Sequence, residues 1–283
     1  MTSQAQKLRD LINTRTPFIA AEAYSALTGR IVERVGFPAA YLGGHACSAF
    51  HYAMPDNGIF SQVEQLEQAA RIAAAIDIPL IADADTLGET VADAFHFTRR
   101  YERAGIAGYH VEDEVNPKHS TYANGLIPIA DMQAKLEACL KARQDPAFVI
   151  IARCDELYPS SRRGGGAGSL DEAIRRGRAY AEAGADVLVF PAATPEMTAE
   201  LMRALPVPIC VLGHAIPGTA FTLSTGWGWI GAAQLHLERA RKLFETGTLD
   251  VDISIDGKES LIEQDVYDAL IGDWAKRTGR PVR

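Results

Sequence analysis

Positive charge, long apolar segments and closely spaced cysteines are all scarce in this sequence. It has 28 Lys and Arg residues against 36 Asp and Glu residues, which gives a net charge of −8. Nucleic acids and anionic membrane surfaces are therefore not expected as partners. No apolar run is long enough to span a bilayer, and the first residues lack the apolar stretch of a signal peptide. These absences predict a soluble cytoplasmic protein.

The cysteines lie far apart and form no CxxC pair: Cys47, Cys139, Cys154 and Cys210. Their spacing predicts neither a zinc site nor a disulfide framework. The acidic balance does not exclude an anionic substrate, because a bound metal ion can reverse the local electrostatic field.

Apolar strand-like segments alternate with helical patterns along most of the chain, and helices end in Gly shortly before the next strand. This alternation is typical of βα repeats with parallel strands. Eight candidate strands favour a closed (β/α)8 barrel, of the TIM type, over an open sheet. No linker divides residues 1–283, so one domain is predicted, with 247–283 as a C-terminal helical extension that covers a neighbouring subunit. The candidate strands are 18–23, 39–42, 78–85, 108–112, 148–153, 187–190, 208–212 and a weak one near residue 222.

Two carboxylates end the third of these strands, in the sequence IPLIADADT at 78–86. Side chains alternate along a strand, so Asp83 and Asp85 are expected on the same side. They would repel one another unless a cation lay between them, and Mg2+, with Mn2+ as an alternative ion, prefers such oxygen ligands. The other interpretation is that they cap the next helix or face solvent.

Polar residues also end the neighbouring strands, and in a (β/α)8 barrel these ends meet at the catalytic rim. Their convergence favours a metal site made by Asp83, Asp85 and Glu112. The residues expected at this rim are Gly43, Gly44, Asp83, Asp85, Glu112, Asp113, Arg153 and Asp155.

Arg153 and the glycine pair suit the binding of a small acid. An arginine can hold a carboxylate through two hydrogen bonds, although Arg153 could instead form a structural pair with a rim carboxylate. Gly43 and Gly44 allow close approach of the backbone and offer N–H groups to an oxyanion; otherwise they form a tight turn.

The segment 114–125 is long and polar for a loop between a strand and a helix, which suggests a lid over the substrate. Lys118, His119, Ser120 and Tyr122 can each transfer a proton or bind an anion. An ordinary solvated loop is the alternative.

Several motifs in order resemble the isocitrate lyase/phosphoenolpyruvate mutase superfamily, in its methylisocitrate lyase and carboxyphosphonoenolpyruvate mutase-like branch. They are AxxAYSALTGRIVERVGFPAAYLGG, DADT, GYHVEDEVNPK, IIARCDE and SLDEAIRRGRAYAEAGAD. The resemblance implies a Mg2+-dependent (β/α)8 barrel, usually a tetramer built from dimers that exchange C-terminal helices. Members make or break C–C or P–C bonds through a pyruvate-type enolate held at the metal ion.

The resemblance also implies a metal centre and a proton-transfer group. Asp83 corresponds to the principal metal ligand, with Asp85 and Glu112 binding through water. Lys118 corresponds to the first lysine of a mobile gating loop. Together with Glu112, Arg153 and Tyr122, it is expected to take part in catalysis.

The resemblance also implies which residues bind the substrate. Arg153 corresponds to the arginine that binds the substrate carboxylate, and Asp83 is expected to contact the substrate as well. Asp56 corresponds to a site aspartate after the second strand. The backbone at Leu42, Gly43 and Gly44 corresponds to the amides around the substrate carboxylate or enolate oxygen.

Departures from the family pattern affect the half of the site that recognises the leaving fragment. The KKCGH or KRCGH loop of isocitrate and methylisocitrate lyases is KHSTY here, with Ser120 in place of the cysteine. A hydroxyl is a poorer acid or base than a thiol near neutral pH. The family's glutamate after the sixth strand is Ala192. An ordinary isocitrate or methylisocitrate lyase is therefore not expected.

The function predicted first is a Mg2+-dependent lyase that cleaves a C–C bond of a 2-hydroxy or 2-oxo dicarboxylate, by retro-aldol or Claisen chemistry or by decarboxylation. One alternative is a P–C mutase or hydrolase acting on phosphonopyruvate-type substrates. Another is a catalytically silent barrel that binds an oxo-acid. A homotetramer is expected in each case, with a small oxo- or hydroxy-acid as its ligand.

Overall fold

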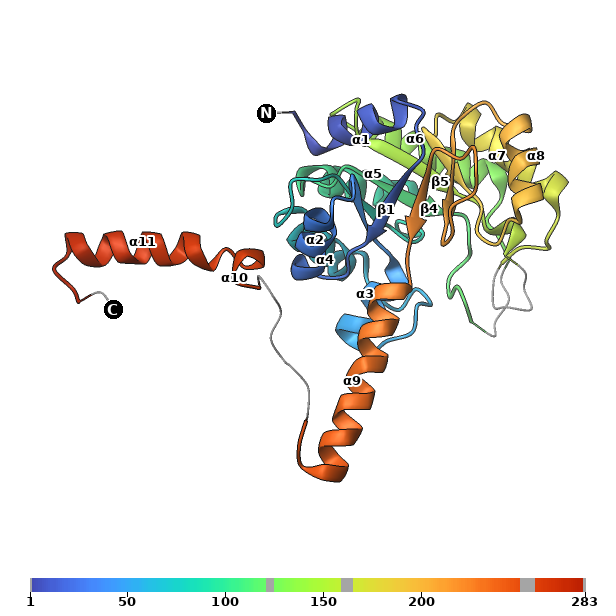
Figure 1. Ribbon diagram of the computed structural model, residues 1–283. Coiled ribbons are helices and arrows are strands. Elements are labelled where there is room, and N and C mark those ends of the chain that lie inside the picture. Colours follow the sequence, from blue (N-terminus) through green and yellow to red (C-terminus); the bar gives the residue numbers. More distant parts are fainter. Residues whose placement is uncertain (1, 121–124, 159–164, 250–257, 282–283) are drawn as a thin grey trace. The chain divides into compact units, whose positions relative to one another are not determined.

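The strands form a closed barrel in the order of the sequence, β1 to β8, and every neighbouring pair is parallel. The computed structural model describes residues 2–120, 125–158, 165–249 and 258–281. Figure 1 shows the strands with helices packed around them. The predicted (β/α)8 barrel is confirmed, including the weak eighth strand. The strands are β1 (Phe18–Glu22), β2 (Ala39–Leu42), β3 (Leu80–Asp83), β4 (Gly108–Glu112), β5 (Val149–Arg153), β6 (Val187–Val189), β7 (Ile209–Leu212) and β8 (Phe221–Ser224).

The helices around the barrel begin at the capping residues that the sequence supplies. Ser25, Ser61 and Thr90 each form a reciprocal capping box with the residue three positions later. Gly36 ends the second helix in the left-handed conformation that glycine adopts without strain. The helices are α1 (Gln4–Asn13), α2 (Ala26–Val35), α3 (Gly44–Tyr52), α4 (Gln62–Ala73), α5 (Val91–Arg103), α6 (Ile129–Ala142), the 3-10 turn η1 (Asp155–Leu157), α7 (Leu170–Glu182), α8 (Pro195–Ala204) and α9 (Trp227–Thr246).

The barrel closes where β1 pairs with β8, with Phe18 opposite Phe221 and their rings stacked 5.0 Å apart. Leu8 and Ile12 of α1 belong to the same apolar cluster as Phe221. The barrel interior near the start of the strands is thus filled with hydrophobic side chains. Polar site residues are expected at the opposite rim, where the strands end.

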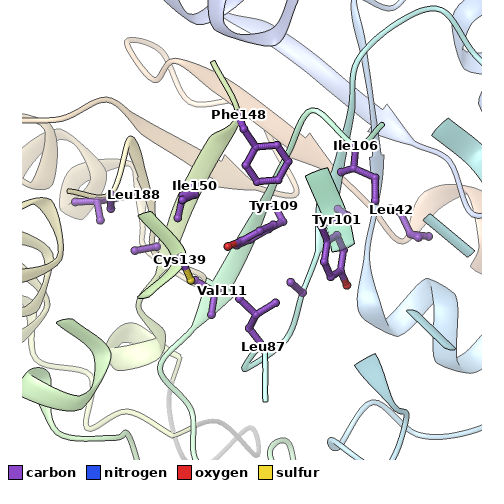
Figure 2. Close-up of a cluster of buried hydrophobic side chains, with 14 of the residues drawn as sticks. Leu42, Leu87, Tyr101, Ile106, Tyr109, Val111, Cys139, Phe148, Ile150 and Leu188 are labelled. Atoms are coloured by element: carbon purple, nitrogen blue, oxygen red, sulfur yellow. The ribbon is translucent and has the colours of Figure 1, made fainter. Parts of the chain in front are cut away.

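Alternation along the strands separates the interior of the barrel from the layer beneath the helices. On β4, Tyr109 and Val111 point into the helix-facing layer, where Tyr109 packs edge-on against Tyr101 and Phe148 (Figure 2). The residues between and after them, His110 and Glu112, take the opposite side. The side of β4 that faces the barrel interior therefore ends in two polar residues, His110 and Glu112.

A second compact unit comprises Gln234–Arg283, and α9 crosses its border with the first unit, Met1–Ala233. It contains α10 (Lys258–Leu261) and α11 (Gln264–Arg277). Five apolar side chains of α11, each more than half exposed, recur at helical spacing: Val266, Tyr267, Leu270, Ile271 and Trp274. None of the described helices is both long and apolar enough to cross a membrane.

Candidate active site

Three buried carboxylates from β3 and β4 converge at the C-terminal rim of the barrel. Asp83, Asp85 and Glu112 each offer an oxygen atom, and these atoms all lie within 4.8 Å of one another. A set made only of carboxylate oxygens suits a hard cation such as Mg2+. The buried Asp/Asp/Glu cluster can therefore hold the metal ion that the sequence predicts.

Asp83 is oriented by three neighbours. The backbone N–H groups of Gly44 and Asp85 donate to its two oxygens at 3.0 and 2.9 Å. Nδ1 of His110 lies 3.5 Å from Oδ1. Burial alone would raise the pKa of Asp83, but the positive charges around it hold the pKa below its usual value. Asp83 is thus ionised and firmly positioned, and it can serve as a metal ligand.

Gly44 is placed where no larger residue fits. A Cβ atom at this position would lie 2.9 Å from Oδ1 of Asp85 and 3.0 Å from Oδ2 of Asp83. Its N–H also begins α3, whose N-terminal end carries a partial positive charge that favours the nearby carboxylates. The Gly44 amide was predicted to bind the substrate carboxylate or enolate oxygen. In the structure it donates a hydrogen bond to Asp83.

Lys118 brings a fully buried ammonium group into the carboxylate cluster. Its Nζ lies 2.5 Å from Asp85, 2.8 Å from Glu112 and 3.2 Å from Asp56. Burial by itself lowers the pKa of Lys118, but these carboxylates outweigh it and raise the pKa well above the usual value. Lys118 is therefore charged, and it neutralises part of the cluster. Burial raises the pKa of Asp85 to about 8 in spite of Lys118.

Arg153 uses the two-pronged edge of its guanidinium on Asp155. Nε and Nη2 donate to Asp155 at 2.9 and 2.8 Å, and Nη1 lies 2.9 Å from Glu112. The structural pair with a rim carboxylate is thus observed. Arg153 also borders the cavity described below, and a guanidinium has five N–H donors. It can meet a substrate carboxylate with the donors that these contacts do not use.

A cavity of about 190 Å³ opens above the cluster. This volume lies below the roughly 300–1,000 Å³ of pockets for drug-sized ligands, so it suits an acid of a few heavy atoms. Its polar part contains most of the predicted substrate-binding residues together with two others. The residues of this polar part are Tyr41, Gly43, Gly44, Asp56, Asp83, His119 and Arg153.

The rest of the cavity lining is largely apolar and aromatic. The ring of Trp229 at the start of α9 lies 4.9 Å from the ring of His45. Three of the described residues that line the cavity can carry a positive charge: His45, His119 and Arg153. The residues of this remaining lining are His45, Tyr158, Pro191, Leu212, Thr225, Gly226, Trp229 and Ile230.

Four of the described residues that were predicted for the site do not line the cavity. Leu42 is fully buried and its side chain packs in the helix-facing layer. The other three are Asp85, Glu112 and Lys118, and the Lys118 ammonium contacts both carboxylates. Tyr122 lies outside the described residues, as does the rest of 121–124, so its catalytic role and the lid stay predictions.

Two buried site residues were missed in the sequence, although alternation along the strands could have found them. Tyr41 precedes Gly43 by two positions, and His110 precedes Glu112 by two, so each shares the interior face. The Tyr41 hydroxyl lies 2.8 Å from Nε2 of His110. His110 thus connects Tyr41, at the cavity, to Asp83.

Comparisons with known proteins identify the family of the chain. Residues 8–235 match the family model described as phosphoenolpyruvate phosphomutase. The chain is 36% identical to the 2,3-dimethylmalate lyase of Eubacterium barkeri over 216 residues, which cover 76% of this chain and 68% of that protein. It is 34% identical to the phosphonopyruvate hydrolase of Variovorax sp. (strain Pal2) over 220 residues, 75% of this chain and 73% of that protein.

A solved structure of phosphonopyruvate hydrolase in complex with oxalate and Mg2+ superposes with a TM-score of 0.82. It is 27% identical, and the match covers 95% of this chain and 98% of that one. The resemblance predicted from the motifs is confirmed. From its family match, its relatives and its barrel, the chain belongs to the isocitrate lyase/phosphoenolpyruvate mutase superfamily.

Proposed function

We propose that the protein is a Mg2+-dependent lyase that cleaves a C–C bond in a small 2-hydroxy or 2-oxo dicarboxylate. The observation that carries this proposal is the mixed lining of one small cavity, in which charged and polar groups occur together with apolar side chains. The charged and polar groups suit the carboxylate and the adjacent oxygen of the acid. The apolar side chains of Leu212, Trp229 and Ile230 suit an alkyl-substituted leaving fragment.

The small number of charged donors in the cavity lining argues against a P–C substrate. A phosphonyl group carries up to two negative charges, and burying it requires several charged hydrogen-bond donors. Lys118 is engaged by Asp56, Asp85 and Glu112, and it does not border the cavity in the described part of the chain. Phosphonopyruvate is therefore the less favoured substrate.

Asp83, Asp85 and Glu112 would hold the metal ion, which when bound acts as a Lewis acid that stabilises negative charge on oxygen. Arg153 binds the substrate carboxylate from the other side. The remaining donors fix the acid against the rim of the barrel, and the small cavity limits the water around it.

Tyr41 and His110 provide a route for the hydroxyl proton of a 2-hydroxy acid. The Tyr41 oxygen takes this proton while Tyr41 passes its own proton to Nε2 of His110, 2.8 Å away. Because Nδ1 of His110 lies 3.5 Å from Asp83, the positive charge formed on the ring faces a carboxylate. The hydroxyl oxygen then becomes the oxo group as the neighbouring C–C bond breaks.

The test is a panel of acids assayed with Mg2+ for release of a 2-oxo acid: 2-methylmalate, 2,3-dimethylmalate, oxaloacetate and phosphonopyruvate. We expect turnover of at least one malate derivative or of oxaloacetate, abolished by EDTA and by Asp83→Ala. Faster phosphate release from phosphonopyruvate would identify a P–C enzyme instead. Binding of oxalate without turnover of any acid would indicate a silent barrel.

A further inference from the structure

His119 lies on the segment after β4 and borders the cavity. Its Nδ1 is 3.1 Å from the backbone oxygen of Asp56 and 3.5 Å from the Asp56 carboxylate. Its Nε2 is 3.5 Å from Oε2 of Glu114. The ring of Tyr158 lies 5.6 Å away, tilted by 45°. The imidazole is therefore fixed between two carboxylates at the edge of the substrate space.

The backbone of His119 is held in a left-handed conformation with φ of 49°. For a residue other than glycine this conformation costs on the order of 1 kcal/mol or more, and such residues cluster at functional sites. The neighbouring Ser120, which stands where the family has its cysteine, differs in placement. Its Oγ donates to the Pro117 carbonyl at 2.8 Å, and the residue is not part of the cavity wall.

The groups around His119 favour its charged form. Burial lowers the pKa of His119, but the contact with Asp56 and the charges of Asp56 and Glu112 outweigh it, although Lys118 opposes them. The net direction is a raised pKa. Burial, with Asp155 and Glu112 nearby, raises the pKa of Glu114 to about 7. The imidazolium thus faces an ionised Asp56 and a Glu114 that is partly protonated at neutral pH.

The geometry points to His119 as the acid that protonates the leaving carbon. Ser120 stands where the family has its acid/base cysteine, so sequence position alone would have suggested the serine for this role. This inference rests on the proposed lyase function. When the C–C bond of the hydroxy acid breaks, its electron pair stays on the leaving fragment. That pair takes the proton of a His119 ring nitrogen and a C–H bond forms. Neutral His119 then regains a proton from solvent, while His110 releases to solvent the proton that it took from the Tyr41 hydroxyl group.

The test compares His119→Asn with Ser120→Ala in the full-length protein, on whichever acid the wild type cleaves. Asparagine tolerates the left-handed backbone and keeps a donor toward Asp56, so the fold is retained. We expect His119→Asn to lower kcat about 100- to 10,000-fold, and Ser120→Ala to lower it less than about tenfold. Binding of oxalate with Mg2+, measured by calorimetry, should change less than about threefold in either variant.

A third variant separates proton transfer from a structural role. Glycine also accepts a positive φ, and His119→Gly leaves space at the cavity edge for a small base. Added imidazole should restore its kcat at least about tenfold, with saturation. A His119→Asn protein that keeps more than about a tenth of wild-type kcat would overturn the inference while leaving the lyase proposal intact. So would a thousandfold loss in Ser120→Ala. A wild type that cleaves none of the acids would overturn both proposals.

Discussion

Lys118 places one ammonium group among three carboxylates, with no solvent exposure of its side chain. Replacing it by an apolar residue leaves several buried carboxylates without their main counter-charge. Removal of one partner from a buried ion pair costs about 3–5 kcal/mol, because the remaining charges are unpaired. A bound divalent cation could supply that missing charge.

Lys118→Met is therefore expected to lower the free energy of unfolding in EDTA by several kcal/mol, on the order of 3–5, and to recover most of it in Mg2+. Urea denaturation with and without Mg2+ measures both. Lys135→Met is the matched control, since Lys135 is also buried but donates to the backbone oxygens of Thr86 and Gly88. An equal recovery by Mg2+ in both variants would contradict the assignment of the charge to the metal cluster.

The raised pKa of His119 predicts a pH dependence of both rate and stability. The unfolded pKa is about 6.5, so the stabilisation is complete below about pH 6.5 and is lost as the pH rises through the higher folded pKa. If His119 is the acid, kcat should fall over the same alkaline range. Wild type and His119→Asn are compared by urea denaturation and by kcat between pH 6 and pH 9. Parallel profiles in the two proteins would count against the prediction.

At the scale of the elements, Glu22 connects the end of β1 to the start of α9. Its carboxylate accepts hydrogen bonds from the Thr225 hydroxyl and from the N–H groups of Gly226, Gly228 and Trp229, at 2.6–3.1 Å. These donors include the first N–H groups of the helix, which have no partner within it. Glu22 therefore also positions Trp229, which lines the cavity.

Glu22→Ala is expected to lower the free energy of unfolding by about 1–3 kcal/mol and to raise KM for the cleaved acid more than it lowers kcat. Glu33→Ala is a suitable control. Glu33 similarly accepts from the N–H groups of Asp77 and Ile78, at the far end of β3 from the site. It should lose stability with KM unchanged. The same rise in KM in both variants would show that the effect is not local.

Site residues at the ends of regular strands could be predicted from the sequence, whereas those on irregular segments could not. Asp83, Glu112 and Arg153 end strands, where alternation and the barrel rule fix the side and the rim. The helix α3 is missing from the prediction because its sequence, GHACSAFHY, lacks a clear apolar period. The contacts of Asp56 and His119 depend on the course of irregular loops, which no periodicity specifies. That Arg153 would pair with Asp155 was only one of two interpretations.

At the scale of the whole molecule, the exposed apolar face of α11 bears on assembly. Val266, Leu270, Ile271 and Trp274 each expose more than half of their surface within the chain. Contiguous apolar surfaces of this kind mark contact sites, and the expected homotetramer would cover this one with a second copy. Light scattering on the purified protein should give four times the 30.6 kDa chain mass.

Leu270→Glu with Ile271→Glu places charges in this face and should shift the mass toward smaller species. Lys276→Glu, in the last turn of the same helix but on the opposite face, serves as a charge-changing control outside the stripe. A wild-type protein that scatters as a monomer at micromolar concentration would contradict the predicted tetramer.

The pairing of β1 with β8 also delays the closure of the barrel during synthesis of the chain. Phe18 and its partner Phe221 are 203 residues apart in the chain. At a synthesis rate of roughly 5–20 residues per second, about 10–40 s pass between the appearance of the two strands at the ribosome. Throughout that interval one edge of β1 lacks the strand that will close the barrel, and such unpaired edges promote aggregation. Long-range pairing of this kind also makes folding slow. The nascent chain therefore carries an aggregation-prone edge until its last strand has emerged.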